Sequence, residues 1–488
     1  MPVSRSLPLL AGLGLFALLP ACSLHTPDAS SGATLPAEAR GDLPEGISEQ
    51  KLPEQWWQLY HDAQLNHWVK LALAHNQDLS QAEANVKAML AGIQEFDAQR
   101  LPSTTTRFAA IYGKSADDQT LAEATDSHAP SQWTFNPGVE LAYQVDVWGQ
   151  VRNSIERAKA QAAASREALR EVRLEVVAQT SRAYIDQCVY GARLHEAEES
   201  LRTLNESLRL SERQREGGIA TELDGERLLS LREQVRADLP MLEARRRVAL
   251  YELAMLSGQE PAGFNVAAQA CRSIPALAAP LPAGDAWHLL ARRPDVRKAE
   301  QQLQAAALQV SIAKADLYPK VSFGASLTAS DHHLANLGDS RSVMFAIGPL
   351  IQWEFPNIKA NQARVSKAQA LHEAAIARYR GAALAALKDV RQALARFDGE
   401  RQRLLALQAA LAHSQRGFDL ASLNHRAGAL DALALLDAQR DLISVRDRHV
   451  QAQGDLARAQ INVFRALGGG WQAPSPAQGL AGETGKRP

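Results

Sequence analysis

The residues with the clearest capacity for chemistry are Asp331, His332 and His333, which follow one another in the sequence. Carboxylate and imidazole groups are common metal ligands, so the triplet has the residue types of a metal site. No additional ligand is evident nearby, and the surrounding segment is polar. We therefore interpret the triplet as part of a solvated loop and predict no metal site.

The motifs that mark common catalytic sites are missing from the sequence. It contains no G-x-S-x-G, no H-E-x-x-H, no P-loop and no Gly-rich dinucleotide turn. Scattered Ser, His and Asp residues are expected by chance in a chain of 488 residues. The sequence thus predicts a protein that is not an enzyme and that uses no cofactor.

The first cysteine, Cys22, follows a secretory signal in which Arg5 precedes the apolar run Leu7–Leu19. The segment Leu19-Pro20-Ala21-Cys22 resembles a bacterial lipobox, whose cysteine is lipidated and becomes the mature N-terminus. An ordinary signal peptide cleaved near Ala21 is the alternative. Because Ser23 is not Asp, the usual sorting rule for such lipoproteins would send the anchor to the outer membrane. We expect a signal peptide at 1–21 and a lipidated tether at 22–50.

The other two cysteines, Cys188 and Cys271, are too few in a chain of this length to indicate a disulfide framework. Cys188 lies in the middle of a predicted helix, where a buried thiol is the usual finding. We therefore expect a free, buried thiol at Cys188, and the function of both cysteines stays open.

The overall composition indicates a mainly helical protein. The formal net charge of −1 gives no sign of a nucleic-acid partner. Hydrophobic residues make up 46% of the chain and aromatic residues only 6%, an Ala/Leu-rich composition that favours helix over sheet. After residue 21, no stretch approaches the roughly 18 uninterrupted apolar residues of a membrane-spanning helix.

Most of the chain is an internal duplication. The window Asp78–Pro102 aligns without gaps on Asp295–Pro319, and Ala158–Gly258 aligns without gaps on Ala368–Gly468. A repeat of this length indicates two copies of one large structural unit, not a short-period solenoid. The expected domains are a first copy at 51–258, a linker at 259–284, a second copy at 285–468 and a flexible tail at 469–488.

Each copy is predicted to open with a helix that ends before a proline, at Leu65–Arg100 and Asp285–Leu317. Two strands with alternating apolar residues follow, each long enough for the roughly 9–11 residues that cross a bilayer. The predicted strands are Ser103–Lys114, Gln132–Val147, Lys320–Ser330 and Ser342–Phe355. Polar segments join them, and the first copy is seven residues longer in this region.

Helices of unusual length come next, predicted at Ser154–Glu216 and Arg364–Arg426. At about 1.5 Å per residue the first would extend for roughly 95 Å. Each ends at a glycine turn and returns as a second helix, predicted at Thr221–Ser257 and Leu430–Leu467. Pro240 is expected to kink the first return helix, and the second has no equivalent proline.

The strand count limits the assembly. Four amphipathic strands cannot close a barrel, and open sheet edges are not tolerated in lipid. Several chains must therefore contribute strands to one closed barrel. Helical hairpins about 95 Å long could only project away from the membrane, and a barrel continued by a helical tube is a conduit.

The chain resembles the TolC-type outer-membrane efflux proteins, in particular the OprM-like, NodT-type lipoproteins of tripartite pumps, over essentially the whole mature chain. The motifs that carry the resemblance are Trp56-Trp57…Asn76-Gln77-Asp78-Leu79, Asp146-Val147-Trp148-Gly149, and Gly428-Ala429-Leu430-Asp431 followed by Leu436-Asp437-Ala438-Gln439-Arg440. The resemblance implies a mainly α fold with a small β part. It also implies a homotrimer with a 12-stranded outer-membrane barrel and a periplasmic tunnel of duplicated helical hairpins.

The function implied by the resemblance is passive export of small molecules such as drugs or toxic compounds. An inner-membrane pump, usually of the resistance–nodulation–division (RND) type, would load the substrate, and a periplasmic adaptor would bridge the pump and the duct. The sequence identifies neither the substrate nor the partners. A soluble coiled-coil scaffold would explain the helices but not the signal and the strands, and a duct for type I protein secretion is the alternative within the family.

The gate is also assigned through the resemblance. In related proteins a Leu and an Asp near the Leu-Asp-Ala-Gln motif narrow the periplasmic aperture, and they map to Leu433 and Asp437, which are four apart and share a helix face. The repeat places Leu223 and Arg227 at the equivalent positions. We hypothesise that Asp437 and Arg227 approach one another and help hold the closed state; two solvated charges are the alternative. Adaptor docking is expected at the tips, at Gly217, Gly218, Ile219, Gly428, Ala429 and Leu430.

Overall fold

The structure, a computed structural model, describes residues 44–48, 50, 52–218, 220–261, 271–282, 292–354 and 358–469. The predicted signal peptide, Cys22 and most of the tether predicted at 22–50 lie outside the described residues. So do Ile219, the first seven residues of the helix predicted at Asp285–Leu317 and nearly all of the predicted tail. The chain forms two compact units. We call them the sheet unit, with residues 86–165 and 299–379, and the hairpin unit, with residues 34–85, 166–298 and the chain from 380 onward.

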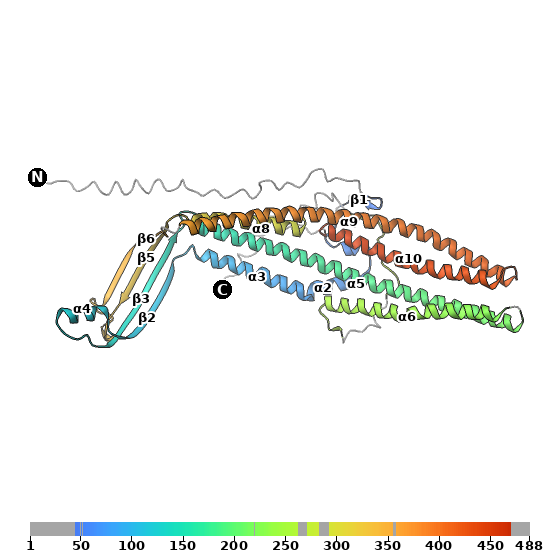
Figure 1. The fold of residues 1–488 in the computed structure, drawn as a ribbon, viewed down its shortest axis with the longest axis horizontal. Coiled ribbons are helices and arrows are strands. Elements are labelled where there is room, and N and C mark those ends of the chain that lie inside the picture. Colours follow the sequence, from blue (N-terminus) through green and yellow to red (C-terminus); the bar gives the residue numbers. More distant parts are fainter. Residues whose placement is uncertain are drawn as a thin grey trace. The chain divides into compact units, whose positions relative to one another are not determined.

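The sheet unit contains the four predicted strands, which are confirmed. They are β2 (Ser103–Gly113), β3 (Gln132–Val145), β5 (Lys320–Ala329) and β6 (Val343–Gln352). They form one antiparallel sheet in the order β2-β3-β5-β6 (Figure 1). The first copy is longer partly because β3 has 14 residues where β6 has 10. The β2–β3 connection, predicted only as a polar segment, contains the helix α4 (Ala116–Ala124).

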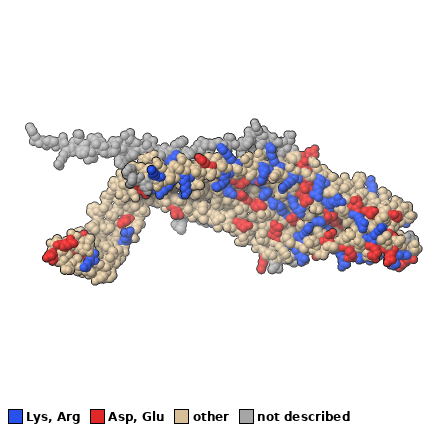
Figure 2. All heavy atoms as spheres, in the orientation of Figure 1, with Lys and Arg blue, Asp and Glu red and all other residues tan. Residues whose placement is uncertain are grey.

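The strand register aligns apolar side chains into rows on one face of the sheet. Val139 pairs with Leu327, which pairs with Phe345, and these side chains are 43%, 54% and 80% exposed. Few charged side chains lie over the strands on the face that Figure 2 shows. An uncovered apolar face of this kind marks a surface that meets lipid or protein.

The helices of the two copies follow the same order. The first copy has α2 (Ala63–His75), α3 (Gln77–Ala98), α5 (Gln150–Glu216) and α6 (Glu222–Leu256). The second has α8 (Pro294–Ala315), α9 (Ile358–Arg426) and α10 (Ala432–Ala466). The remaining elements are β1 (Ile47–Ser48), which pairs with β4 (Leu281–Pro282), and the short 3₁₀ helices η3 (Trp56–Tyr60) and η6 (Leu334–Asn336). The predicted helical hairpins are confirmed.

Within the described ranges, no helix combines the length and the apolar character that crossing a membrane requires.

The prediction of a single helix at Leu65–Arg100 is wrong, because the helix breaks at Asn76. Asn76 adopts an extended conformation, and its side-chain oxygen accepts a hydrogen bond from the Leu79 backbone N–H at 3.1 Å. Its amide donates to the Leu256 carbonyl at 3.0 Å. Asn76 therefore starts α3 as a cap and connects this break to the end of α6.

The prediction of a free thiol at Cys188 is also wrong. Cys188 is fully buried, as expected, but it forms a disulfide with Cys271. A β-carbon at Gly191 would lie 1.9 Å from the Cys271 carbonyl oxygen, so only glycine lets the linker lie against α5 at this point. The disulfide joins two segments 83 residues apart in the sequence, a relationship that spacing alone does not reveal.

Pro240 lies inside α6 on its exposed side, and the helix continues through it from Glu222 to Leu256. The kink stays a prediction.

The opening motif of the first copy belongs to the core of the hairpin unit. Trp56 is fully buried and stacks on Phe464 of α10 with ring centroids 4.7 Å apart. Asp62 caps α2 by accepting from Gln64 and Leu65, and it also accepts the Tyr184 hydroxyl of α5 at 3.0 Å. The motif therefore fastens the N-terminal helices to both long hairpins.

Candidate functional site at the hairpin tips

The first tip connects α5 to α6 through a glycine turn. Gly218 has φ +72°, a left-handed conformation that favours glycine. Thr221 then caps α6 in a capping box with Asp224. Hydrogen bonds from Thr221 hold the pKa of Asp224 below its usual range, with smaller contributions from the charges of Arg227 and His425. The tip is thus a defined turn between two capped helices.

The second tip repeats this design. Gly428 has φ +73°, and the Ala429 N–H donates to the Asn424 carbonyl at 2.9 Å. Asp431 caps α10 by accepting from the Ala434 N–H at 2.9 Å. A β-carbon at Gly218 or Gly428 would meet nothing within 4 Å, so both turns stand open to a partner.

The predicted gate residues lie in the first turns of the return helices. Leu433 is 41% exposed and Asp437 is exposed, whereas Leu436 between them is buried. This burial pattern places Leu433 and Asp437 on one open face of α10. On α6, Leu223 is 56% exposed and Arg227 is half-buried.

The structure does not pair Asp437 with Arg227 inside one chain. Among the described residues, no ion pair joins these two side chains, and the carboxylate whose pKa responds to Arg227 is Asp224. Their approach to one another therefore stays a prediction.

Above the tips, α5 and α10 run side by side within the hairpin unit and are joined by ion pairs. The distances are 3.3, 2.5 and 2.7 Å for Arg465–Glu175, Arg458–Asp186 and Arg193–Asp447. These side chains are partly exposed, so each pair contributes up to about 1 kcal/mol. They connect the first copy to the second between Glu175 and Arg193 of α5 and between Asp447 and Arg465 of α10.

Nearer the tips, an apolar cluster replaces the ion pairs. Leu204 of α5, Leu231 and Val235 of α6, and Leu436 of α10 pack together and are buried. Beyond this cluster a cavity of about 250 Å³ opens between the hairpins, lined by residues that include Leu210, Gln214, Phe418 and His425. The packing between the hairpins is therefore interrupted next to the tips.

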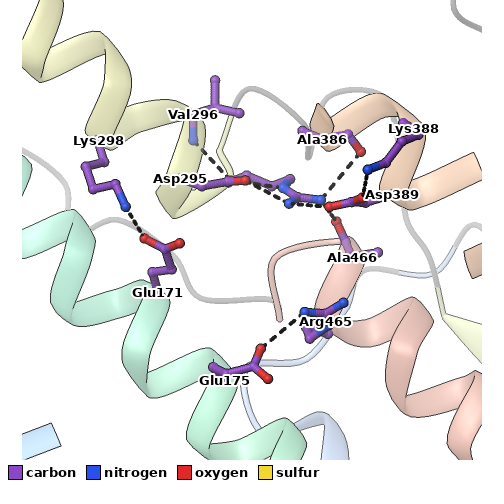
Figure 3. Close-up of polar contacts among 11 residues, drawn as sticks. Glu171, Glu175, Asp295, Val296, Lys298, Ala386, Lys388, Asp389, Arg465 and Ala466 are labelled. Carbon is purple, nitrogen blue, oxygen red and sulfur yellow. Dashed lines mark hydrogen bonds and ion pairs between the residues drawn. The ribbon is translucent and has the colours of Figure 1, made fainter. Parts of the chain in front are cut away.

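At the other end of this contact, a polar belt joins the two copies (Figure 3). Arg293, with only 10% of its side chain exposed, pairs with Asp295 at 2.8 Å and with Asp389 of α9 at 3.5 Å. Its guanidinium also donates to the Ala466 carbonyl at the end of α10 at 2.8 Å. Figure 3 also shows Lys298 of α8 paired with Glu171 of α5. This end of the hairpins is therefore held by several polar contacts, one of them to the buried Arg293.

The triplet Asp331–His333 has a structural role in the sheet unit. The His332 ring lies 3.0 Å from the Trp133 carbonyl and 3.6 Å from the Asp118 carboxylate of α4. Asp331 accepts the His333 backbone N–H at 2.8 Å. In the part of the chain that the structure describes, no group of three or more His, Cys, Asp or Glu side chains could hold a metal ion.

The Asp146-Val147-Trp148-Gly149 motif forms the joint between β3 and α5. The Asp146 carboxylate accepts the backbone N–H groups of Val151 and Arg152 at 2.9 and 2.8 Å, so it caps α5. The Trp148 ring N–H donates to the Pro319 carbonyl at 2.8 Å. The motif thus positions the long helix.

Sequence reasoning missed His425, which joins the two tips. It occupies the last turn of α9, where a cationic side chain interacts favourably with the helix C-terminus, and that position was the available signal. Its contact with Gln214 of the other hairpin requires the fold.

Comparison with known proteins places this geometry among outer-membrane channels. The family model described as outer membrane efflux protein matches residues 68–259 and 288–469. The pyoverdine export outer membrane protein OpmQ of Pseudomonas aeruginosa is 31% identical over 468 residues, which cover 95% of this chain and 97% of that protein. The cation efflux system protein CusC of Escherichia coli is 27% identical over 417 residues, 86% of this chain and 88% of that protein.

Solved structures agree. The outer-membrane channel OprN superposes with a TM-score of 0.84 at 30% identity, covering 93% of this chain and 100% of that chain. The outer membrane protein VceC of Vibrio cholerae shares the fold, with a TM-score of 0.76 at 24% identity over 86% of this chain and 99% of that chain.

Proposed function

The chain belongs to the outer membrane efflux protein family and is an outer-membrane efflux channel, and we propose that it works as the passive exit duct of a tripartite pump for small molecules. An inner-membrane pump of the RND type supplies the energy, and a periplasmic adaptor joins that pump to the hairpin tips. The duct is a homotrimer anchored to the membrane through lipid on Cys22. The observation that carries the proposal is the pairing, in one chain, of an open apolar sheet with duplicated hairpins.

The free edges of the sheet support assembly from several copies. The strand order leaves β2 and β6 each with one unpaired edge among the described strands. Unpaired backbone N–H and C=O groups are costly in lipid, so each edge needs a partner strand. Pairing β6 of one copy with β2 of the next closes the sheet in a ring, which is the behaviour of a cyclic head-to-tail interface.

The two equivalent helices α3 and α8 differ in burial, which also favours a ring. Both have 22 residues, but Leu79 is the buried residue of α3, whereas α8 buries many, among them Leu303 and Val310. Side chains of α8 contact both long helices, through Lys298 to Glu171 of α5 and through Val310 in a cluster with Ala368 of α9. A second copy supplies the missing neighbour of α3.

A third observation concerns α6, which carries exposed apolar side chains at seven-residue spacing. Met241, Val248 and Met255 are 57%, 64% and 56% exposed. The repeat makes Ala244 of α6 equivalent to Gly454 of α10, and Gly399 of α9 equivalent to Val189 of α5. Gly454 and Val189 touch inside one chain. A β-carbon at Gly399 meets nothing within 4 Å of its own chain, so α6 of a second copy fits there.

Cysteine cross-linking tests this assembly. A chain carrying both Ala244→Cys and Gly399→Cys should give covalently linked dimers and trimers on mild oxidation. Ala244→Cys alone is the matched control and should stay monomeric in denaturing gels. Exclusively monomeric products from the double variant would contradict the proposed contact.

The tips provide the gate. Asp437 and Arg227 from neighbouring hairpins attract one another across the aperture, and Leu433 and Leu223 narrow it. One exposed pair contributes little, but three symmetry-related copies together bias an equilibrium of a few kcal/mol. Removal of both charges should open the gate and raise the conductance.

The adaptor docks on the open glycine turns. The described docking residues are Gly217, Gly218, Gly428, Ala429 and Leu430, and Ile219 completes the first tip. Bulky substitution of Gly218 and Gly428, for example by Trp, should abolish adaptor capture while leaving trimers intact. Undiminished capture would exclude the tips as the docking site.

Small molecules are favoured over proteins as the exported class because the names of OpmQ and CusC refer to pyoverdine and to cations. Deletion of the gene should therefore sensitise its host to drugs, dyes or metal salts, with rescue by the intact gene. Loss of a secreted protein without any sensitisation would instead support the type I secretion alternative.

A further inference from the structure

The joint between the two hairpin tips of one chain depends on a histidine. The His425 ring, in the last turn of α9, places Nδ1 2.9 Å from the Leu430 carbonyl of its own tip. Its Nε2 lies 3.4 Å from the side-chain oxygen of Gln214, in the last turns of α5. His425 and Gln214 both line the 250 Å³ cavity that separates the hairpins here.

Charged groups face this ring from the elements packed around it. Asp224 of α6 interacts electrostatically with His425, and Glu206 of α5 lines the same cavity. The carbonyl groups at the end of α9 add partial negative charge. The positive charge of Arg426, the next residue of α9, counteracts these negative charges. The residues that α10 contributes to the cavity lining, Ala432, Leu435 and Leu436, are uncharged.

The hydrogen bonds give the protonation state a structural consequence. A neutral imidazole has one N–H, and with Nδ1–H donated to the Leu430 carbonyl, Nε2 is an acceptor that faces the acceptor oxygen of Gln214. The protonated ring has a second N–H, which donates to that oxygen. The neutral ring can instead accept an N–H from a turned Gln214 amide, so both forms make a contact, and the cationic form makes the stronger, charge-assisted hydrogen bond.

We propose that His425 is a proton-sensitive latch that holds the two hairpin tips of one chain together. This single contact has a large effect on the separation of the tips because the neighbouring cavity provides little packing between the hairpins. The ion pairs and the apolar cluster lie farther from the tips. Histidine is the side chain that ordinarily changes charge between about pH 5 and 8. Acidification tightens the joint, and alkalinisation releases it. Its effect on conductance rests on the proposed function.

Pulsed dipolar EPR tests the latch in the full-length trimer. Spin labels at Glu216→Cys and Ala429→Cys report the separation of the two tips, and dilution with unlabelled chains leaves one labelled chain per trimer. The distance distribution should be shorter and narrower at about pH 5.5 than at about pH 8. In His425→Gln, which keeps a polar side chain but cannot titrate in this range, both pH values should give the broader distribution.

His413→Gln is the matched control, because His413 is an exposed histidine of the same helix. It should retain the wild-type pH response. Identical wild-type distributions at the two pH values, or an unchanged pH response in His425→Gln, would overturn the latch. Conductance of the same samples distinguishes failure of the proposed duct from failure of the latch. A protein without conductance would refute the duct, and the tip distances would still test the latch.

Discussion

Gly454 of α10 and Val189 of α5 lie in direct contact where the two hairpins of one chain cross. A β-carbon at position 454 would lie only 2.4 Å from Val189 Cγ2, closer than two carbon atoms can approach. The absence of a side chain at Gly454 therefore sets the distance between the helices that carry the inter-hairpin ion pairs.

Gly454→Ala should force α10 away from α5 and destabilise the protein by about 1–3 kcal/mol, the usual effect of overpacking. Gly417→Ala is the control, since a β-carbon there meets nothing within 4 Å and alanine favours the helix. The thermal unfolding temperature of the purified protein should fall for the first variant and not for the second. Equal temperatures for both variants would show that the hairpins tolerate a wider spacing.

Removal of the disulfide should also destabilise the hairpin unit. Replacement of Cys188 and Cys271 by serine frees a loop defined by a separation of 83 residues, which should lower the free energy of unfolding by about 2–5 kcal/mol. Denaturant unfolding measures this, and reductant should have the same effect on the wild type and none on the double variant.

The glycine under the linker gives an independent test of the same bond. Gly191→Leu should prevent the Cys271 carbonyl from reaching α5 and leave both thiols free. Maleimide labelling of denatured protein would detect two additional thiols. A fully oxidised Gly191→Leu protein would contradict the seating of the linker on α5.

Arg293 should stabilise the protein through its contacts with Asp295, Asp389 and the Ala466 carbonyl. Arg293→Met leaves Asp295 and Asp389 without their buried partner and should destabilise the protein by about 2–4 kcal/mol, somewhat less than the effect for a fully buried pair. Lys388→Met, which removes a side chain that is 60% exposed and pairs with the same Asp389, should change stability by less than about 1 kcal/mol. Denaturant midpoints of the two variants check the difference.

Much of the fold is predictable from the sequence because its signals are local. Pro102 and Pro319 follow helices, strand alternation is visible after each of them, and Gly218 and Gly428 end the long helices. The strands and the return helices therefore lie within a few residues of the predicted bounds, whereas α9 begins earlier than predicted, at Ile358, and α8 begins later, at Pro294. The short helix α4 also had a local signal, since Ser115 caps it through Asp118.

The errors concern residues whose roles depend on distant partners. Asn76 breaks a helix where its amide meets Leu256, and Cys188 meets Cys271 because the linker returns to α5 at Gly191. The spacing of these residues along the chain predicts neither contact. Of the candidate site, the tips and their exposed leucines were predictable, but His425 was not, because its partner Gln214 lies on the other hairpin.

The conductance of the purified protein in a planar lipid bilayer tests the proposed duct and its gate most directly. The wild type should insert as uniform channels of low conductance, and Arg227→Ala combined with Asp437→Ala should raise the single-channel conductance because the tips lose the charges that hold them closed. Glu226→Ala combined with Arg440→Ala, a neighbouring pair of exposed charges, is the control and should match the wild type. An unchanged conductance in the Arg227/Asp437 variant would contradict the gate, and no conductance from any intact trimer would contradict the duct itself.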